Sequence, residues 1–273
     1  MMFYNDGQRI LTDRAFLTQV QYRTDENLAA RQSVYAYQQP QIDLPRSVLD
    51  LASLAGRETV ADVGCGNGIY LAELAHSGHA GPLLGFDLSP GMLEAARAVV
   101  PAASFVVGDA AALPVADRAA DVTLAPHMLY HVPDRMAAAR EFRRITRPGG
   151  RLLVVLNGAD HLAELRHLVT ATAADVGLPA EDIGDEYRTY LMMTLDRGGE
   201  LLSGVFSSVQ RHDFRAELAL PGAQPVADYV ASMRSTQAMP DPAGFVAAVA
   251  DRVPFGPDGI FRVRTHSGVL ICQ

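Results

Sequence analysis

The chain has 273 residues, and 49% of them are apolar, so it is long and apolar enough to bury a sizeable core. It carries a formal charge of −8 and contains no lysine, and its arginines cluster densely only at residues 140–147, on one predicted helix. A nucleic-acid binder usually shows a basic stripe, so this balance disfavours RNA or DNA as a partner. Apolar runs of about 18 residues, which a membrane-spanning helix needs, are absent.

The chain start and the cysteines point to a reducing compartment. Residues 1–6 lack the basic and apolar regions of a signal peptide. The two cysteines, Cys65 and Cys272, lie far apart and predict neither a disulfide framework nor a metal site. We therefore expect a cytoplasmic protein without a bound metal.

Two helices are predicted before the first strand. Residues 1–22 look irregular apart from a short helix from Asp13. A helix over residues 24–39 would end at Pro40, because proline cannot continue a helix. Asp43 then suits the N-cap position of a further helix, which has a proline in its first turn.

From residue 58 onward, short apolar strands alternate with helices. The predicted strands cover residues 60–63, 82–87, 104–107, 120–124 and 151–156, and the helices between them cover residues 69–75, 90–100 and 133–146. Such alternation predicts a parallel sheet with helices on both faces. Ligands of these sheets bind outside the carboxyl ends of the strands.

The alternation breaks after Asn157. Helices are predicted at residues 161–176, 181–195, 199–206, 225–236 and 242–253, and strands at 209–220 and 261–272. The sequence contains no internal repeat. We divide the chain into an N-terminal helical lid (1–42), a cofactor-binding core (43–157), a helical cap (158–207) and a C-terminal part (208–273) that completes the sheet and roofs the pocket.

The first strand ends in a turn with glycines at alternate positions. Val60–Val63 is followed by Gly64, Gly66 and Gly68, and a helix begins at Ile69. Glycine tolerates positive φ and leaves no Cβ between the backbone and a ligand. The helix start adds free N–H groups, so the turn suits a flat or anionic ligand. A dinucleotide fingerprint would place its third glycine where Ile69 stands.

This spacing resembles the E/D-x-G-x-G-x-G motif of class I S-adenosylmethionine-dependent methyltransferases. Three later segments match the same family in order: residues 84–92, 107–114, and 121–133 with 145–155 behind it. The resemblance is to the small-molecule subgroup that includes the ubiquinone and menaquinone enzymes. It implies a Rossmann-like, doubly wound α/β fold with a seven-stranded sheet in the order 3-2-1-4-5-7-6, the last strand antiparallel and a helical lid above.

The resemblance also implies which residues hold S-adenosylmethionine. Asp62 would lie near the methionine ammonium, and Asp87 would accept hydrogen bonds from the ribose hydroxyls. Asp109 would bind the adenine amine, and Tyr22 would cover the methionine carboxylate. The remaining cofactor candidates line the same motifs: Gly64, Cys65, Gly66, Asn67, Gly68, Leu88, Met92, Gly108, Ala110 and Pro126. Leu88 and Met92 suit ordinary helix–strand packing as well.

Two histidines after the fourth core strand are the catalytic candidates. Methyl transfer to an activated sulfonium centre needs a base only when the acceptor must lose a proton. His127 and His131 are candidates for that base or for positioning the acceptor, since imidazole titrates near neutral pH. The alternative is a structural role, because the segment around His131 recurs in the family with different acceptors.

A set of tyrosines and methionines is the candidate acceptor pocket. Tyrosine and methionine side chains suit an apolar pocket, although their spacing also fits an ordinary core-facing helix. The residues are Tyr130, Tyr187, Tyr190, Tyr229 and Met233.

The resemblance predicts methyl transfer from S-adenosylmethionine to an oxygen, nitrogen or carbon atom of a small organic acceptor in specialised metabolism. Two alternatives stay open: a non-methylating lyase or cyclase on the same fold, and a methyltransferase acting on RNA or a carrier-bound peptide. The expected partner is a small molecule, without nucleic acid or membrane, and a homodimer is left open.

Overall fold

An eight-stranded sheet organises the computed structural model, which describes residues 15, 17–18, 26–178, 187 and 190–273. The strand order is β1-β7-β8-β6-β5-β2-β3-β4. Without the two-residue strand β1 (Gln38–Gln39), this is the predicted order 3-2-1-4-5-7-6 read from the other edge. The predicted fold class is therefore confirmed. The sheet gains one short edge strand because Gln38–Gln39 pairs antiparallel with β7 (Val209–Leu220).

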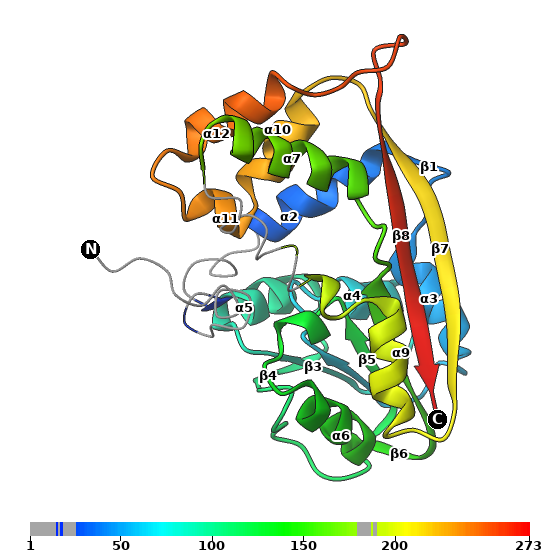
Figure 1. Cartoon of the computed structure of the whole chain (residues 1–273). Helices are drawn as coiled ribbons and strands as arrows, with labels where there is room; N and C mark the ends of the chain where they lie inside the picture. The colour runs from blue at the N-terminus through cyan, green and yellow to red at the C-terminus, as the bar shows by residue number, and fades with distance from the viewer. Residues whose placement is uncertain (1–14, 16, 19–25, 179–186, 188–189) are drawn as a thin grey trace.

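Five parallel strands form the cofactor half of the sheet (Figure 1). They are β2 (Val60–Val63), β3 (Leu83–Asp87), β4 (Ser104–Val107), β5 (Ala120–Pro126) and β6 (Thr146–Asn157). β2 lies in the centre between β3 and β5, so the chain reverses its direction of winding next to the glycine turn. This is the switch point, where open α/β sheets bind their ligands.

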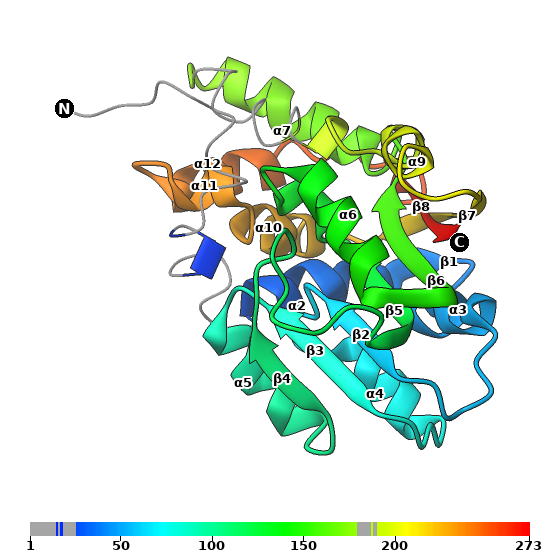
Figure 2. The ribbon, with the colours of Figure 1, turned by 90° about the horizontal axis from the view of Figure 1, so that it is seen from below.

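Helices cover both faces of these strands (Figure 2). One face carries α3 (Leu44–Ala52), α4 (Ile69–His76) and α5 (Pro90–Val99), whose apolar side chains form one core with the strands. The other face carries α6 (Arg135–Ile145) and α9 (Leu195–Ser203), which form a second core. The cap predicted at Asp43 is present, because its carboxylate accepts a hydrogen bond from the N–H of Arg46. Ser89 caps α5 in the same way and accepts a hydrogen bond from the N–H of Met92.

Two long strands connect the sheet to a separate layer of helices. β8 (Phe261–Cys272) pairs antiparallel with both β6 and β7, as predicted for the last strand. β7 and β8 run past the parallel strands toward the helices drawn at the top of Figure 1. These helices are α2 (Glu26–Ser33), α7 (Ala163–Asp175), α10 (Gln224–Ala231), α11 (Arg234–Gln237) and α12 (Pro242–Ala250). A third apolar core joins this layer to the near ends of β7 and β8.

Four predicted helices differ from the structure in the part of the chain that it describes. The helix expected over residues 24–39 is α-helical over Glu26–Ser33, continues as the 3₁₀ turn η2 (Val34–Tyr37) and ends before β1. Tertiary pairing with β7 removes its last residues from the helix. The helix expected over 225–236 is divided into α10 and α11. The stretch expected as two helices over 181–195 and 199–206 contains α9 from Leu195 onward, and residues 179–186 and 188–189 lie outside the described residues.

A short 3₁₀ turn, η3 (Leu129–His131), follows β5 and carries two predicted site residues, Tyr130 and His131. Within the described residues, none of the helices is long and apolar enough to cross a membrane.

Candidate active site

A cavity of about 650 Å³ opens at the carboxyl ends of β2, β3 and β5, and the helical layer supplies its opposite wall. Most of the predicted site residues line it: Gly64, Cys65, Gly66, Asn67, Asp87, Leu88, Met92, Gly108, Asp109, Ala110, Pro126, His127, Tyr130, His131, Tyr187, Tyr190, Tyr229 and Met233. The sequence motifs and the lid residues thus meet in one space. Asp62 and Gly68 lie behind the wall, and Tyr22 lies outside the described residues.

The glycine turn is shaped by close approach as well as by positive φ. The N–H of Gly64 donates to the carbonyl oxygen of Phe86 at 2.7 Å, which holds the turn against the end of β3. Gly64 has a φ of +69°, and a Cβ there would lie 2.6 Å from the Cβ of Met128. Gly66, with a φ of +52°, faces open space apart from Leu28. A side chain at Gly64 would therefore displace Met128, the residue before η3, whereas one at Gly66 would project toward the helical layer.

Asp87 ties the second strand to the first turn. One of its carboxylate oxygens accepts the N–H of Gly66 at 2.9 Å, and the other accepts the N–H of Ser89 at 2.8 Å. Burial raises the pKa of Asp87, and the backbone hydrogen bonds oppose that rise. Each carboxylate oxygen can accept a further hydrogen bond, and Asp87 lines the cavity, which suits two vicinal hydroxyls.

Asp109 stands at the corresponding position after β4. Its carboxylate accepts the N–H of Ala111 at 3.0 Å, so the side chain closes the turn that follows the strand. Gly108 donates its N–H to the carbonyl oxygen of Asp87 at 3.0 Å. The two acidic residues therefore lie on neighbouring turns at one edge of the cavity.

Asp62 is a buried carboxyl group without a partner. It is 0% exposed, and neither carboxyl oxygen has a hydrogen-bond partner within the described part of the chain. Burial, together with the negative charge of Asp87, raises the pKa of Asp62 to about 8. A cation or a bound water near the turn would supply what this carboxyl group lacks. Because Asp62 lies behind the wall, it would reach a positively charged amine in the cavity only through a bound water, whereas Asp87 lines the cavity, where a ribose would lie.

Two further candidates near the turn, Cys65 and Met92, are buried side chains that pack against their neighbours. Cys65 is buried, and burial raises the pKa of its thiol. The thiol is therefore protonated at neutral pH, which argues against a nucleophilic role. Met92 is 1% exposed and fills the space between α5 and the cavity wall.

His127 occupies an unusual backbone position at the end of β5. Its φ is +52°, in the left-handed region that non-glycine residues rarely adopt. The N–H of His127 donates to the carbonyl oxygen of Val155 at 2.9 Å, which extends the β5–β6 pairing through this residue. Burial lowers the pKa of its imidazole to about 4, so the ring is neutral at pH 7. A neutral imidazole that faces a cavity can accept a proton.

His131 contacts the helical layer. Nη2 of Arg234 donates to its Nδ1 at 3.3 Å, because a guanidinium can only donate. The ring also lies edge-on to Tyr130, with 4.5 Å between ring centroids. Arg234 is 2% exposed and lines the cavity. His131 is thus positioned by both walls of the cavity, which fits the structural alternative as well as an acceptor-positioning role.

The predicted acceptor residues gather on one side of the cavity. The rings of Tyr130 and Tyr190 stack at 4.4 Å, and the hydroxyl of Tyr187 donates to the sulfur of Met233 at 3.6 Å. Tyr229 lines the same space from α10. The predicted acceptor residues thus bring aromatic rings from η3, from the segment before α9 and from α10 into a single wall.

Sequence reasoning missed several polar groups in this cavity, three of which lie at or after the end of β6. Asn157 ends β6, His161 lies at the start of the insertion, and Arg166 is on the first turn of α7. Asn157 had a sequence signal, because it follows a buried strand directly, as Asp87 does. His161 and Arg166 had none, since they lie in a stretch whose pattern is that of an ordinary helix. Tyr35, from η2, also lines the cavity, whereas the resemblance implies Tyr22 as the tyrosine near the cofactor.

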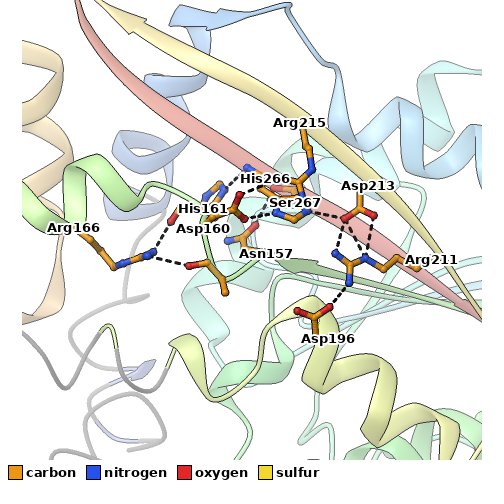
Figure 3. A network of polar contacts seen from close by, with 11 residues as sticks. Asn157, Asp160, His161, Arg166, Asp196, Arg211, Asp213, Arg215, His266 and Ser267 are labelled. Carbon is orange, nitrogen blue, oxygen red and sulfur yellow. Dashed lines mark hydrogen bonds and ion pairs between the residues drawn. The ribbon is translucent and has the colours of Figure 1, made fainter.

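A polar network lies directly behind these residues (Figure 3). His266 on β8 lies between two carboxylates, with Nδ1 bonded to Asp160 and Nε2 to Asp213 at 2.6 Å. Arg215 pairs with Asp160 at 3.0 Å, and Arg211 pairs with Asp213. The network fixes the loop between β6 and α7 against β8. It thereby fixes the backbone from which His161 reaches the cavity.

Comparisons with known proteins agree with this geometry. Residues 61–154 match the family described as the methyltransferase domain. The chain is 37% identical over 109 residues to a demethylmenaquinone methyltransferase of Beutenbergia cavernae, a match that covers 40% of this chain and 45% of the relative. It is 36% identical over 124 residues to a trans-aconitate 2-methyltransferase of Methylobacterium radiotolerans, covering 45% and 46% of the two chains. The chain thus spans a little under half the length of these relatives.

A solved structure extends the likeness to most of the fold. A methyltransferase assigned to an antibiotic biosynthesis pathway of Anabaena variabilis superposes with a TM-score of 0.61 at 16% identity, covering 84% of this chain and 96% of that one. This likeness concerns the fold alone. The family match and the curated relatives show that residues 61–154 form a class I, S-adenosylmethionine-dependent methyltransferase domain. The glycine turn, Asp87 and the partnerless Asp62 fit that cofactor.

Proposed function

We propose that the whole chain transfers a methyl group from S-adenosylmethionine to a small organic acceptor. The observation that supports this proposal is the hydrogen bond from the N–H of Gly66 to Asp87, because both residues line a cavity whose other wall is aromatic. The proposed cofactor and acceptor sides therefore share one cavity. The acidic overall charge supports a small molecule over RNA.

The chain's own residues have separate roles in this proposal. The cofactor supplies a methyl group on a positively charged sulfur, which is already activated for displacement. Asp87 binds its ribose and Asp109 binds its adenine. The glycine turn lets the backbone approach the cofactor closely, because glycine has no Cβ. The helical layer excludes water, which favours a reaction that depends mainly on positioning. His127, neutral at pH 7, receives the acceptor's proton where the acceptor must lose one.

We propose further that residues 1–42 and 158–207, with the helices of 208–273, act as the lid over the core of residues 43–157. The third apolar core supports this division, since it joins α7 to α10, α12 and η2. Two relatives are named for acceptors that are small acids or quinones, demethylmenaquinone and trans-aconitate. A small oxygen-bearing acceptor is therefore the first class to test.

The test is conversion of S-adenosylmethionine to S-adenosylhomocysteine by the full chain with a panel of small phenols, acids and amines. Acceptor-dependent formation of S-adenosylhomocysteine is expected, and Asp87→Ala should abolish most of it. Product formed from an acceptor without consumption of the cofactor would favour the lyase or cyclase alternative. Activity confined to RNA, with a steep loss as salt rises, would favour the nucleic-acid alternative.

A further inference from the structure

The hydrogen bonds around His161 determine which of its ring nitrogens carries the proton. The backbone N–H of His266 donates to Nδ1 of His161 at 3.0 Å. A backbone N–H cannot accept, so Nδ1 carries no hydrogen. His161 is 7% exposed, and burial lowers the pKa of its imidazole to about 3, so the ring is neutral. A neutral ring with a bare Nδ1 has its hydrogen on Nε2.

This proton position determines the role of Tyr35. Nε2 of His161 lies 3.0 Å from the hydroxyl oxygen of Tyr35, so the imidazole donates and the tyrosine accepts. Within the described part of the chain, His161 is the hydrogen-bond partner of that hydroxyl. The pKa of Tyr35 is raised by burial, so the phenol keeps its hydrogen. That hydrogen points away from His161, and Tyr35 lines the cavity.

A positive charge lies on the other side of His161. The guanidinium of Arg166 donates to the carbonyl oxygens of His161 at 2.6 Å and Ala159 at 2.9 Å, as Figure 3 shows. It also lies over the ring of Tyr187, 6.0 Å from the centroid. Backbone carbonyls hold Arg166 in place without neutralising it, and among the described residues no carboxylate pairs with it. Arg166 lines the cavity as well.

We propose that Tyr35 and Arg166 bind an anionic oxygen of the methyl acceptor, so that the acceptor is an organic acid, with His161 as the positioning residue for Tyr35. The inference rests on the proposed function, since it concerns the acceptor side of the same cavity. Tyr35 donates one hydrogen bond, Arg166 supplies the charge, and the aromatic wall holds the apolar part. Hydrogen bonds to charged groups are roughly twice as strong as neutral ones, so an acid gains more here than its neutral analogues.

The test compares three probes of nearly equal shape: benzoate, benzamide and toluene. Their dissociation constants are measured by NMR titration of the full chain saturated with S-adenosylhomocysteine. We expect benzoate to bind about 10-fold or more tighter than toluene, with benzamide between them. Tyr35→Phe should weaken the binding of benzoate and benzamide. It should leave the dissociation constant of toluene within about twofold, because phenylalanine retains the aromatic ring. Arg166→Gln should weaken benzoate alone.

Two variants serve as matched controls. Tyr37→Phe removes a hydroxyl from the same 3₁₀ turn at an exposed residue outside the cavity, and Arg140→Gln removes an exposed arginine from α6. Both should leave all three constants unchanged. Benzoate that binds no tighter than toluene or benzamide, or that binds equally to Tyr35→Phe and the unaltered chain, would overturn the inference.

The role of His161 has a readout of its own. The ¹⁵N shifts of its ring, assigned with a His161→Gln variant, should show a bare Nδ1 and a protonated Nε2 at pH 7. A protonated Nδ1 would overturn the positioning role. Titration with S-adenosylhomocysteine alone distinguishes a failure of the proposed function from a failure of this inference. Absence of S-adenosylhomocysteine binding would contradict the proposed function. Normal binding of it without a preference for benzoate would contradict this inference only.

Discussion

The carboxylate of Asp87 accepts the backbone N–H of Gly66 at 2.9 Å, which joins the end of the second core strand to the middle of the first glycine turn. The acid and the turn are separated by 21 residues in the chain but form one rigid edge of the cavity. A ribose held by the acid is therefore placed next to the turn. This relationship underlies the predictions below.

Asp87→Ala should weaken binding of S-adenosylmethionine by about 1.5–3 kcal/mol, roughly 10- to 150-fold, because it removes acceptors for two hydroxyls. Calorimetric titration measures this change. The matched control is Glu94→Ala on the exposed face of α5, which should bind as the unaltered chain does. Unchanged affinity of the Asp87 variant for S-adenosylmethionine would contradict the role of Asp87 in binding the ribose.

Gly64→Ala should destabilise the protein more than Gly78→Ala. Both residues have positive φ, +69° and +84°, so each alanine pays a backbone cost of about 1–2 kcal/mol. A Cβ at Gly78 meets nothing within 4 Å, whereas one at Gly64 lies 2.6 Å from Met128. Overpacking adds about 1–3 kcal/mol at Gly64. Urea unfolding of both variants checks the difference, and equal losses would contradict the close approach of η3.

Asp62 should make the ligand-free protein less stable as pH rises. Its folded-state pKa, about 8, exceeds the unfolded value of about 4, so the unfolded chain ionises this group first. The stability it contributes is fully present below pH 4 and is lost progressively toward pH 8. The free energy of unfolding should therefore fall less between pH 5 and pH 8 in Asp62→Asn than in the unaltered chain. The same pH dependence in both proteins would show that Asp62 is not a buried, partnerless acid.

His127 should stay neutral far below the usual histidine range. Burial lowers its pKa to about 4, so the ring is unprotonated at neutral pH and holds a proton only at lower pH. A titration of the histidine ring shifts by NMR, assigned with His127→Gln, should give a midpoint near pH 4. A midpoint between 6 and 7 would place the ring in contact with water and would remove the argument for an enclosed base.

The cofactor side was predictable because its signals are local. A strand that ends at an acid, and a turn that needs positive φ at Gly64, leave their mark within a few neighbouring residues. The acceptor side depends on pairing between distant segments. Nothing near His161 in the sequence shows that the N–H of His266, 105 residues away, sets its tautomer. Likewise, the end of the helix before β1 depends on β7, which follows much later in the chain.

The most direct test of the central claim is a crystal structure of the full chain with S-adenosylhomocysteine. We expect the ribose hydroxyls within hydrogen-bond distance of Asp87, the adenine beside Asp109, and the sulfur facing His127 and the aromatic wall. The distances from Asp87 to the ribose decide the matter. A ligand bound elsewhere, or one whose sulfur faces away from the cavity, would contradict the account.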